Sequence, residues 1–107
     1  MTSQDMPYYL LCQLMDQPAA SQRSLAKYFG VSLGKVNYCL KALAATGLIK
    51  ANNFRRSDNK LAYAYVLTPD GLEARSRLTK AFLQRKLLEF EALQSEIEVL
   101  RRQVLAA

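Results

Sequence analysis

Residues 21–47 read SQRSLAKYFGVSLGKVNYCLKALAATG, and most of the architecture can be argued outward from them. Ser21 is a suitable N-cap for a short helix, and Gly30 is suited to end that helix in the left-handed conformation. Ser32 can cap a further helix, which Gly47 ends in the same way. The stretch therefore predicts two helices separated by only a few residues.

The flanking sequence predicts four more elements around these helices, which are expected over residues 22–29 and 32–46. We expect an upstream helix over residues 5–16, which is apolar almost all round and so covered on more than one side. Two strands are expected over 48–54 and 61–68, the second with alternating side chains, and a long C-terminal helix is expected over 69–105. Thr68 and Pro69 are typical first residues of a helix. At 1.5 Å per residue, the last helix would be about 55 Å long, too long for so small a core to cover.

The predicted order is helix, helix, tight turn, helix and β-hairpin, which is the plan of a winged helix-turn-helix domain. The fold class is thus mainly α with a small β-hairpin, followed by a long C-terminal coiled-coil helix. We expect residues 1–68 to be the DNA-binding domain and residues 69–107 to be the dimerisation helix.

Composition excludes several functions. The 107 residues contain no histidine, so the commonest general base and most zinc sites are missing, and no phosphate-binding glycine motif is present. We therefore expect neither an enzyme, nor a metal site, nor a cofactor. No signal peptide or membrane span is expected, and Cys12 and Cys39 indicate core residues of a cytoplasmic protein, with a redox pair as the alternative.

The net charge of +6 points to a polyanionic partner, and most of the excess lies in the first two thirds of the chain. In a winged helix domain the third helix enters the major groove and the hairpin tip reaches flanking DNA. The expected contacts to double-stranded DNA come from the start of the second helix, the third helix and the hairpin tip: Ser21, Gln22, Arg23, Ser32, Gly34, Lys35, Asn37, Tyr38, Lys41, Arg55, Arg56 and Lys60. The competing interpretation is that these are solvated charges, helix caps and packing residues.

Apolar residues on the long helix follow a spacing of three and four from Phe90 to Val104, which is typical of a coiled-coil seam. The expected homodimer contacts are Leu83, Leu87, Phe90, Leu93, Ile97, Leu100 and Val104. A helix folded back on its own domain would show similar spacing. The pattern also leaves open whether the two helices of a coiled coil run parallel or antiparallel.

Several stretches together resemble the MarR-type winged-helix regulators, and most closely the subgroup called EPS-associated MarR family transcriptional regulators. They are residues 21–27, 31–38, 40–43, 47–50 and 67–71, among which residues 32–38 are the most specific. The resemblance covers nearly the whole chain. It implies a bacterial, cytoplasmic, homodimeric transcription regulator, with a link to exopolysaccharide genes that comes from the family name. The N-terminal portion here is only one helix, unlike typical members, and any small-molecule effector is left open.

A second hypothesis treats the winged helix as a scaffold for protein interactions, with the C-terminal coil recruiting a partner. Charge separates the two hypotheses, because an interaction module does not require basic residues on the two elements expected to meet DNA. An enzyme is a distant third, since Asp5, Asp16 and Asp58 are scattered along the chain.

Overall fold

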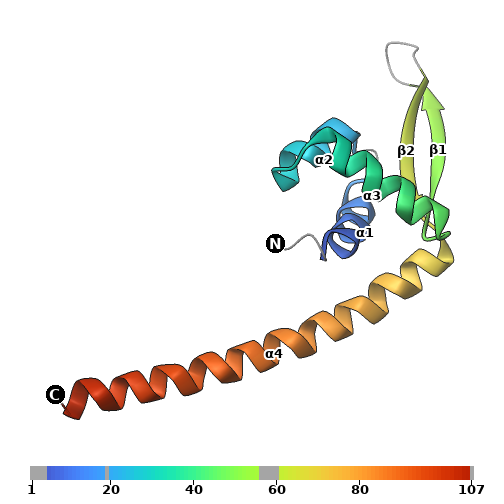
Figure 1. The fold of residues 1–107 in the computed structure, drawn as a ribbon. Coiled ribbons are helices and arrows are strands. Elements are labelled where there is room, and N and C mark those ends of the chain that lie inside the picture. The colour runs from blue at the N-terminus through green and yellow to red at the C-terminus, as the bar shows by residue number, and fades with distance from the viewer. Residues whose placement is uncertain (1–4, 19, 56–60, 107) are drawn as a thin grey trace. The chain divides into compact units, whose positions relative to one another are not determined.

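The computed structural model describes residues 5–18, 20–55 and 61–106, with only the backbone described at 52–55 and 61–64. Three helices, a two-stranded hairpin and a long helix follow in the predicted order (Figure 1). Their bounds are α1 Met6–Asp16, α2 Gln22–Phe29, α3 Leu33–Ala45, β1 Ile49–Arg55, β2 Leu61–Leu67 and α4 Pro69–Ala106. The fold class predicted from the sequence is confirmed, and this is the element order of a winged helix-turn-helix domain.

The two predicted serine caps are formed. Ser21 Oγ accepts a hydrogen bond from the backbone N–H of Ser24 at 3.0 Å, and Ser32 Oγ accepts one from Lys35 N–H at 3.1 Å. Both serines have extended backbone, as an N-cap requires. Each cap satisfies an amide that has no partner inside the helix, so α2 and α3 begin where their sequences predict.

Glycines in the left-handed region end both helices, with φ of +66° at Gly30 and +78° at Gly47. After α3, Gly47 N–H donates to Ala44 O and Leu48 N–H donates to Leu43 O, which is the Schellman arrangement. Leu48 thus completes the helix end, and β1 starts one residue later than the sequence predicts.

The core is apolar and is built mainly from one face of each helix. On α3, Val36, Leu40 and Leu43 are buried, and helical periodicity places all three on one face. The other buried apolar residues are Met6, Leu10, Leu11, Leu14, Leu25, Ala26, Ile49 and Ala74.

Some expectations about the core were wrong in detail. The amphipathic pattern of residues 22–29 predicts that Leu25 and Phe29 are buried, but Phe29 is only half-buried, and Ala26 takes the buried place beside Leu25. Cys12 and Cys39 are free and half-buried, so they line the core without being enclosed by it. The helix α1, which we expect to be covered on more than one side, buries Met6, Leu10, Leu11 and Leu14 within this chain and leaves Met15 46% exposed.

The hairpin is antiparallel, with Ile49 opposite Leu67 and Arg55 opposite Leu61. At its base, the carbonyl of Leu48 accepts a hydrogen bond from Thr68 N–H at 3.0 Å. The predicted turn at its tip, residues 56–60, lies outside the described residues.

The start of α4 is tied to the end of α3 through Thr68. Its hydroxyl donates to Gly47 O at 2.6 Å and accepts from Gly71 N–H at 3.1 Å, as a helix N-cap does. Gly71 is buried against this joint, and a Cβ there would overlap the carbonyl oxygen of Leu48. Only glycine allows the first turn of α4 to lie so close to that backbone.

The chain forms two units, of which the first ends at Arg75 and the second begins at Ser76. In the second unit every large apolar side chain from Leu83 onward is exposed. None of the helices in the described part of the chain is apolar enough over sufficient length to cross a membrane.

Candidate nucleic-acid interface

The outer side of α3 carries the side chains that the sequence assigns to DNA. Because Val36, Leu40 and Leu43 face the core, residues about 180° away at 100° per residue face outward. Tyr38 lies there with 75% exposure, and Gly34 and Lys41 are also exposed. No atom lies within 4 Å of the Cβ that alanine would add at Gly34, so this turn is open to a close approach.

Lys35 and Asn37 flank this outer side and are each half-buried. Gln22, the first residue of α2, donates a hydrogen bond from Nε2 to Asn37 Oδ1 at 3.3 Å. The amide of Asn37 is therefore held by α2 while its N–H₂ group remains able to donate. Sequence reasoning named both residues but missed their contact, since the two are fifteen positions apart and no periodicity relates them.

The start of α2 lies beside α3 and presents the other predicted backbone-contacting residues. Ser21, Arg23 and Ser24 are exposed, and Ser24 Oγ donates back to Ser21 O at 2.9 Å. The N-terminal amides of a helix favour a phosphate, which adds to the charge of Arg23. The cap role predicted for Ser21 is confirmed, and a phosphate contact remains a prediction.

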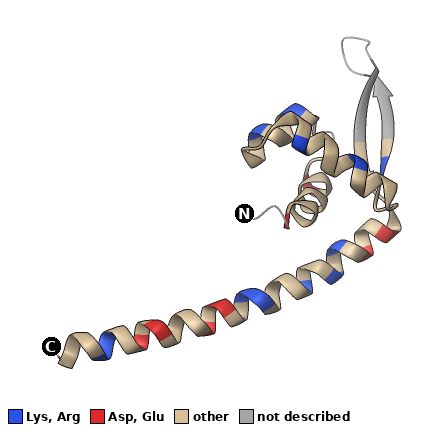
Figure 2. Ribbon diagram, viewed as in Figure 1, with Lys and Arg blue, Asp and Glu red and all other residues tan. Residues whose placement is uncertain are grey.

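The charges between residues 17 and 57 are all of one sign. From residue 17 to residue 57 there are seven basic residues and no acidic one. Figure 2 shows basic residues and no acidic ones on α2 and α3. The basic residues of the described side chains here are Arg23, Lys27, Lys35, Lys41 and Lys50, so Lys27 and Lys50 extend the predicted set.

The wing is described only in part. Arg55 ends β1 opposite Leu61, and its backbone is the only part of it described. Arg56 and Lys60, the other two predicted contacts of the tip, lie outside the described residues.

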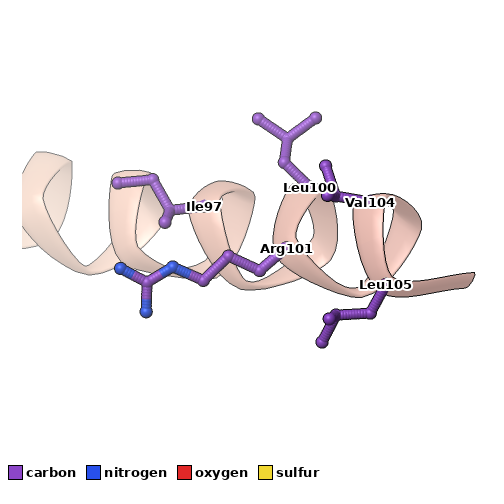
Figure 3. A pocket seen from close by; sticks show the side chains of 5 residues that line it. All are labelled: Ile97, Leu100, Arg101, Val104 and Leu105. Atoms are coloured by element: carbon purple, nitrogen blue, oxygen red, sulfur yellow. The ribbon is translucent and has the colours of Figure 1, made fainter.

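The predicted dimer residues of α4 form an exposed apolar stripe, which we call the seam. Their exposed fractions run from 39% at Ile97 to 74% at Val104. Ile97, Leu100, Arg101, Val104 and Leu105 line an open groove, with Leu100 and Val104 on one side and Arg101 and Leu105 on the other (Figure 3). Leu88, Val99 and Leu105 are exposed too, and the heptad spacing alone did not identify them.

Within the described residues no group of three or more potential metal ligands occurs. The outer side of α3 instead offers hydrogen-bond donors, positive charges and an exposed aromatic side chain.

Comparison with known proteins agrees with this fold. Residues 10–50 match a family described as winged helix-turn-helix DNA-binding. No curated protein sequence matches the chain.

Three solved structures share the fold. The PcaV transcriptional regulator from Streptomyces coelicolor, in complex with its natural ligand, aligns over 100% of this chain and 76% of its own, with a TM-score of 0.68 and 21% identity. MarR from Staphylococcus aureus, in complex with salicylate and kanamycin, aligns over 90% and 67%, with a TM-score of 0.58 and 18% identity. FabT from Streptococcus pneumoniae, in complex with DNA, aligns over 92% and 73%, with a TM-score of 0.56 and 18% identity.

Proposed function

We propose that this chain is a MarR-type transcription regulator that binds double-stranded DNA sequence-specifically as a homodimer in the bacterial cytoplasm. The observation that carries the proposal is the outer side of α3, where Tyr38 and Lys41 are exposed and the surrounding sequence has no acidic residue. An α-helix with this surface fits the major groove, where base edges are distinguishable. The likeness to FabT, whose structure contains DNA, supports the same reading.

In this proposal, α3 contacts the base edges and other elements contact the DNA backbone. Asn37 has the side chain that pairs with adenine, and Lys41 can meet either guanine or phosphate. The N-terminus of α2 and the arginines of the wing supply phosphate and minor-groove contacts. Two α3 helices, one from each copy, would occupy successive major grooves about one helical turn apart.

The seam of α4 supports the homodimer. A single apolar stripe on a helix requires a covering surface, and a second copy supplies an identical stripe. The resemblance to the EPS-associated subgroup points to exopolysaccharide genes as the targets. An interaction module alone is not favoured, because it gives no reason for a basic, acid-free α2 and α3.

The test is selection of bound duplexes from a random DNA pool, followed by affinity measurements at two salt concentrations. We expect a two-fold symmetric motif with half-sites about ten base pairs apart, and an affinity that falls steeply with salt. Recovery of no enriched motif, with only weak salt-sensitive binding, would refute specific recognition.

Variants can distinguish the residues that contact the DNA backbone from those that contact bases. Replacement of Arg55 and Arg56 by Ala should weaken binding to the selected and to random duplexes alike, whereas changes at Asn37 or Tyr38 should alter base preference. Arg102→Ala on α4 is the matched control and should leave both unchanged. Equal effects of all variants on specific and random duplexes would contradict this division.

A further inference from the structure

The orientation of the two copies can be argued from the seam and from the charges beside it. We infer that a second copy of this chain packs on the seam in parallel and in register over Phe90–Val104, with Glu96 of each copy paired to Arg101 of the other. This inference rests on the homodimer proposed above and adds its geometry.

The seam residues themselves suit a parallel pair of two helices. Steps of three and four from Phe90 fix the heptad, with Phe90, Ile97 and Val104 at the first core position and Leu93 and Leu100 at the second, positions a and d. All five are exposed in the isolated chain, by 39% to 74%. Within parallel coiled coils, β-branched residues at a with leucine at d favour two strands, and Ile97, Val104 and both leucines fit this rule.

The flanking charges distinguish the two orientations. Glu96 directly precedes Ile97 at position g, and Arg101 directly follows Leu100 at position e. In a parallel pair, a g residue lies beside the e residue five positions further along the other helix. The parallel dimer therefore brings Glu96 and Arg101 together twice.

An antiparallel pair gives no such attraction. Keeping each a residue opposite a d residue allows two registers: one puts Leu93 against Ile97 and brings the two Glu96 side chains together, and the other puts Leu93 against Val104 and leaves Glu96 beside Gln103. Within the described part of the chain, neither Glu96 nor Arg101 has an ion-pair partner of its own, and both are exposed. Opposite charges thus support the parallel pair, and neither antiparallel register pairs Glu96 with Arg101.

The structure also indicates where the seam begins. Lys86 stands at the next d position upstream, and its ammonium is 3.1 Å from Glu89 Oε2 and 5.2 Å from the centroid of the Phe82 ring. These contacts hold a charge at a position that a longer seam would fill with an apolar residue. The pairing we infer therefore covers the two heptads that start at Phe90, and it leaves the upstream seam residues Leu83 and Leu87 outside the in-register segment.

Parallel pairing also suits two DNA half-sites. It attaches both winged-helix units to the same end of the coil. An antiparallel pair would attach them at opposite ends, with the two copies of Ser76 about 57 Å or more apart along the coil axis at 1.5 Å per residue.

Disulfide formation in the full-length chain tests the orientation. In the variant Val104→Cys, parallel copies place the two thiols side by side, whereas the two antiparallel registers separate them by about 16 Å or about 27 Å at 1.5 Å per residue. In Gln94→Cys, the thiols face each other only in the antiparallel register that puts Leu93 against Ile97. The linked peptides are identified by mass spectrometry, and the unsubstituted chain controls for Cys12 and Cys39.

We expect residue 104 to link to its own copy under mild oxidation and residue 94 to remain unlinked. Linkage at 94 but not at 104, or at neither position in a chain that sedimentation shows to be dimeric, would overturn the parallel arrangement. A monomeric unsubstituted chain would overturn the homodimer as well, so the two failures are distinguishable.

Charge variants give an independent readout of the dimer dissociation constant. Arg101→Glu should weaken the dimer roughly tenfold, because two attractive pairs become repulsive, and the exchange of both charges in Glu96→Arg/Arg101→Glu should restore it. Glu98→Arg, outside the seam, is the matched control. Tighter dimerisation of Glu96→Gln would instead indicate that the two glutamates meet, and would refute the pairing.

Discussion

Replacement of Gly71 by alanine tests how closely α4 lies against the joint after α3. Gly71 is buried, and a methyl group there would overlap Leu48 O and reach within 3.4 Å of Leu67 Cβ. The obstacle at Leu48 is backbone, so no side-chain rotation relieves it. The first turn of α4 would have to move by roughly 1–1.5 Å to restore an ordinary contact.

That shift has a cost that can be estimated bond by bond. It would break the hydrogen bonds from Thr68 N–H to Leu48 O and from Thr68 Oγ1 to Gly47 O, at about 1 kcal/mol each. Overpacking adds roughly 1–3 kcal/mol, and the better helix propensity of alanine returns about 1 kcal/mol. We expect the free energy of unfolding to fall by about 2–4 kcal/mol.

Urea unfolding followed by tyrosine fluorescence measures this change. The chain has no tryptophan, and all six tyrosines lie between residues 8 and 65, so the signal reports on the first unit alone. Gly34→Ala, at an open helical position, is the matched control and should be neutral or stabilising by up to about 1 kcal/mol. A Gly71→Ala variant within about 0.5 kcal/mol of the unsubstituted chain would refute the proposed close packing.

Three further variants probe a cap, the seam and the α2–α3 contact. Ser32→Ala removes the oxygen that accepts from Lys35 N–H and should destabilise the first unit by about 1 kcal/mol in the same urea assay; no change would mean that water replaces the cap. Leu93→Asp combined with Ile97→Asp buries charge in the seam and should give monomers in sedimentation, whereas an unchanged mass would place the dimer contact elsewhere. Gln22→Ala removes the hydrogen bond to Asn37 and should reduce discrimination between selected and scrambled duplexes about three- to tenfold; retained discrimination would show that Asn37 needs no such support.

The fold was predictable because its signals are local. A serine hydroxyl reaches an amide three residues away, and a glycine ends a helix through its own backbone. Ser21 and Gly30 therefore predicted the bounds of α2, and Ser32 the start of α3, without tertiary information. The start of β1 was missed by one residue because Leu48 N–H is used by the end of α3. Whether Leu48 belongs to the end of α3 or to the start of β1 depends on both elements at once.

The candidate site was predictable only as a set of residues. Periodicity correctly placed Tyr38 and Lys41 on the outer side of α3. The bond from Gln22 to Asn37 and the packing of Gly71 on Leu48 join residues far apart in sequence, and a single sequence carries no signal for either distance. All the predicted DNA contacts stay predictions, and those at 56 and 60 also lie outside the described residues.

The lack of carboxylates between residues 17 and 57 also affects the protein when no DNA is bound. Seven positive charges in one small unit repel one another, and dissolved salt screens that repulsion. Added salt should therefore stabilise the free fold, while the same salt weakens its hold on DNA. Ionic strength thus acts in opposite directions on folding and on binding. The unbound protein is least stable at low salt, where it binds DNA most tightly.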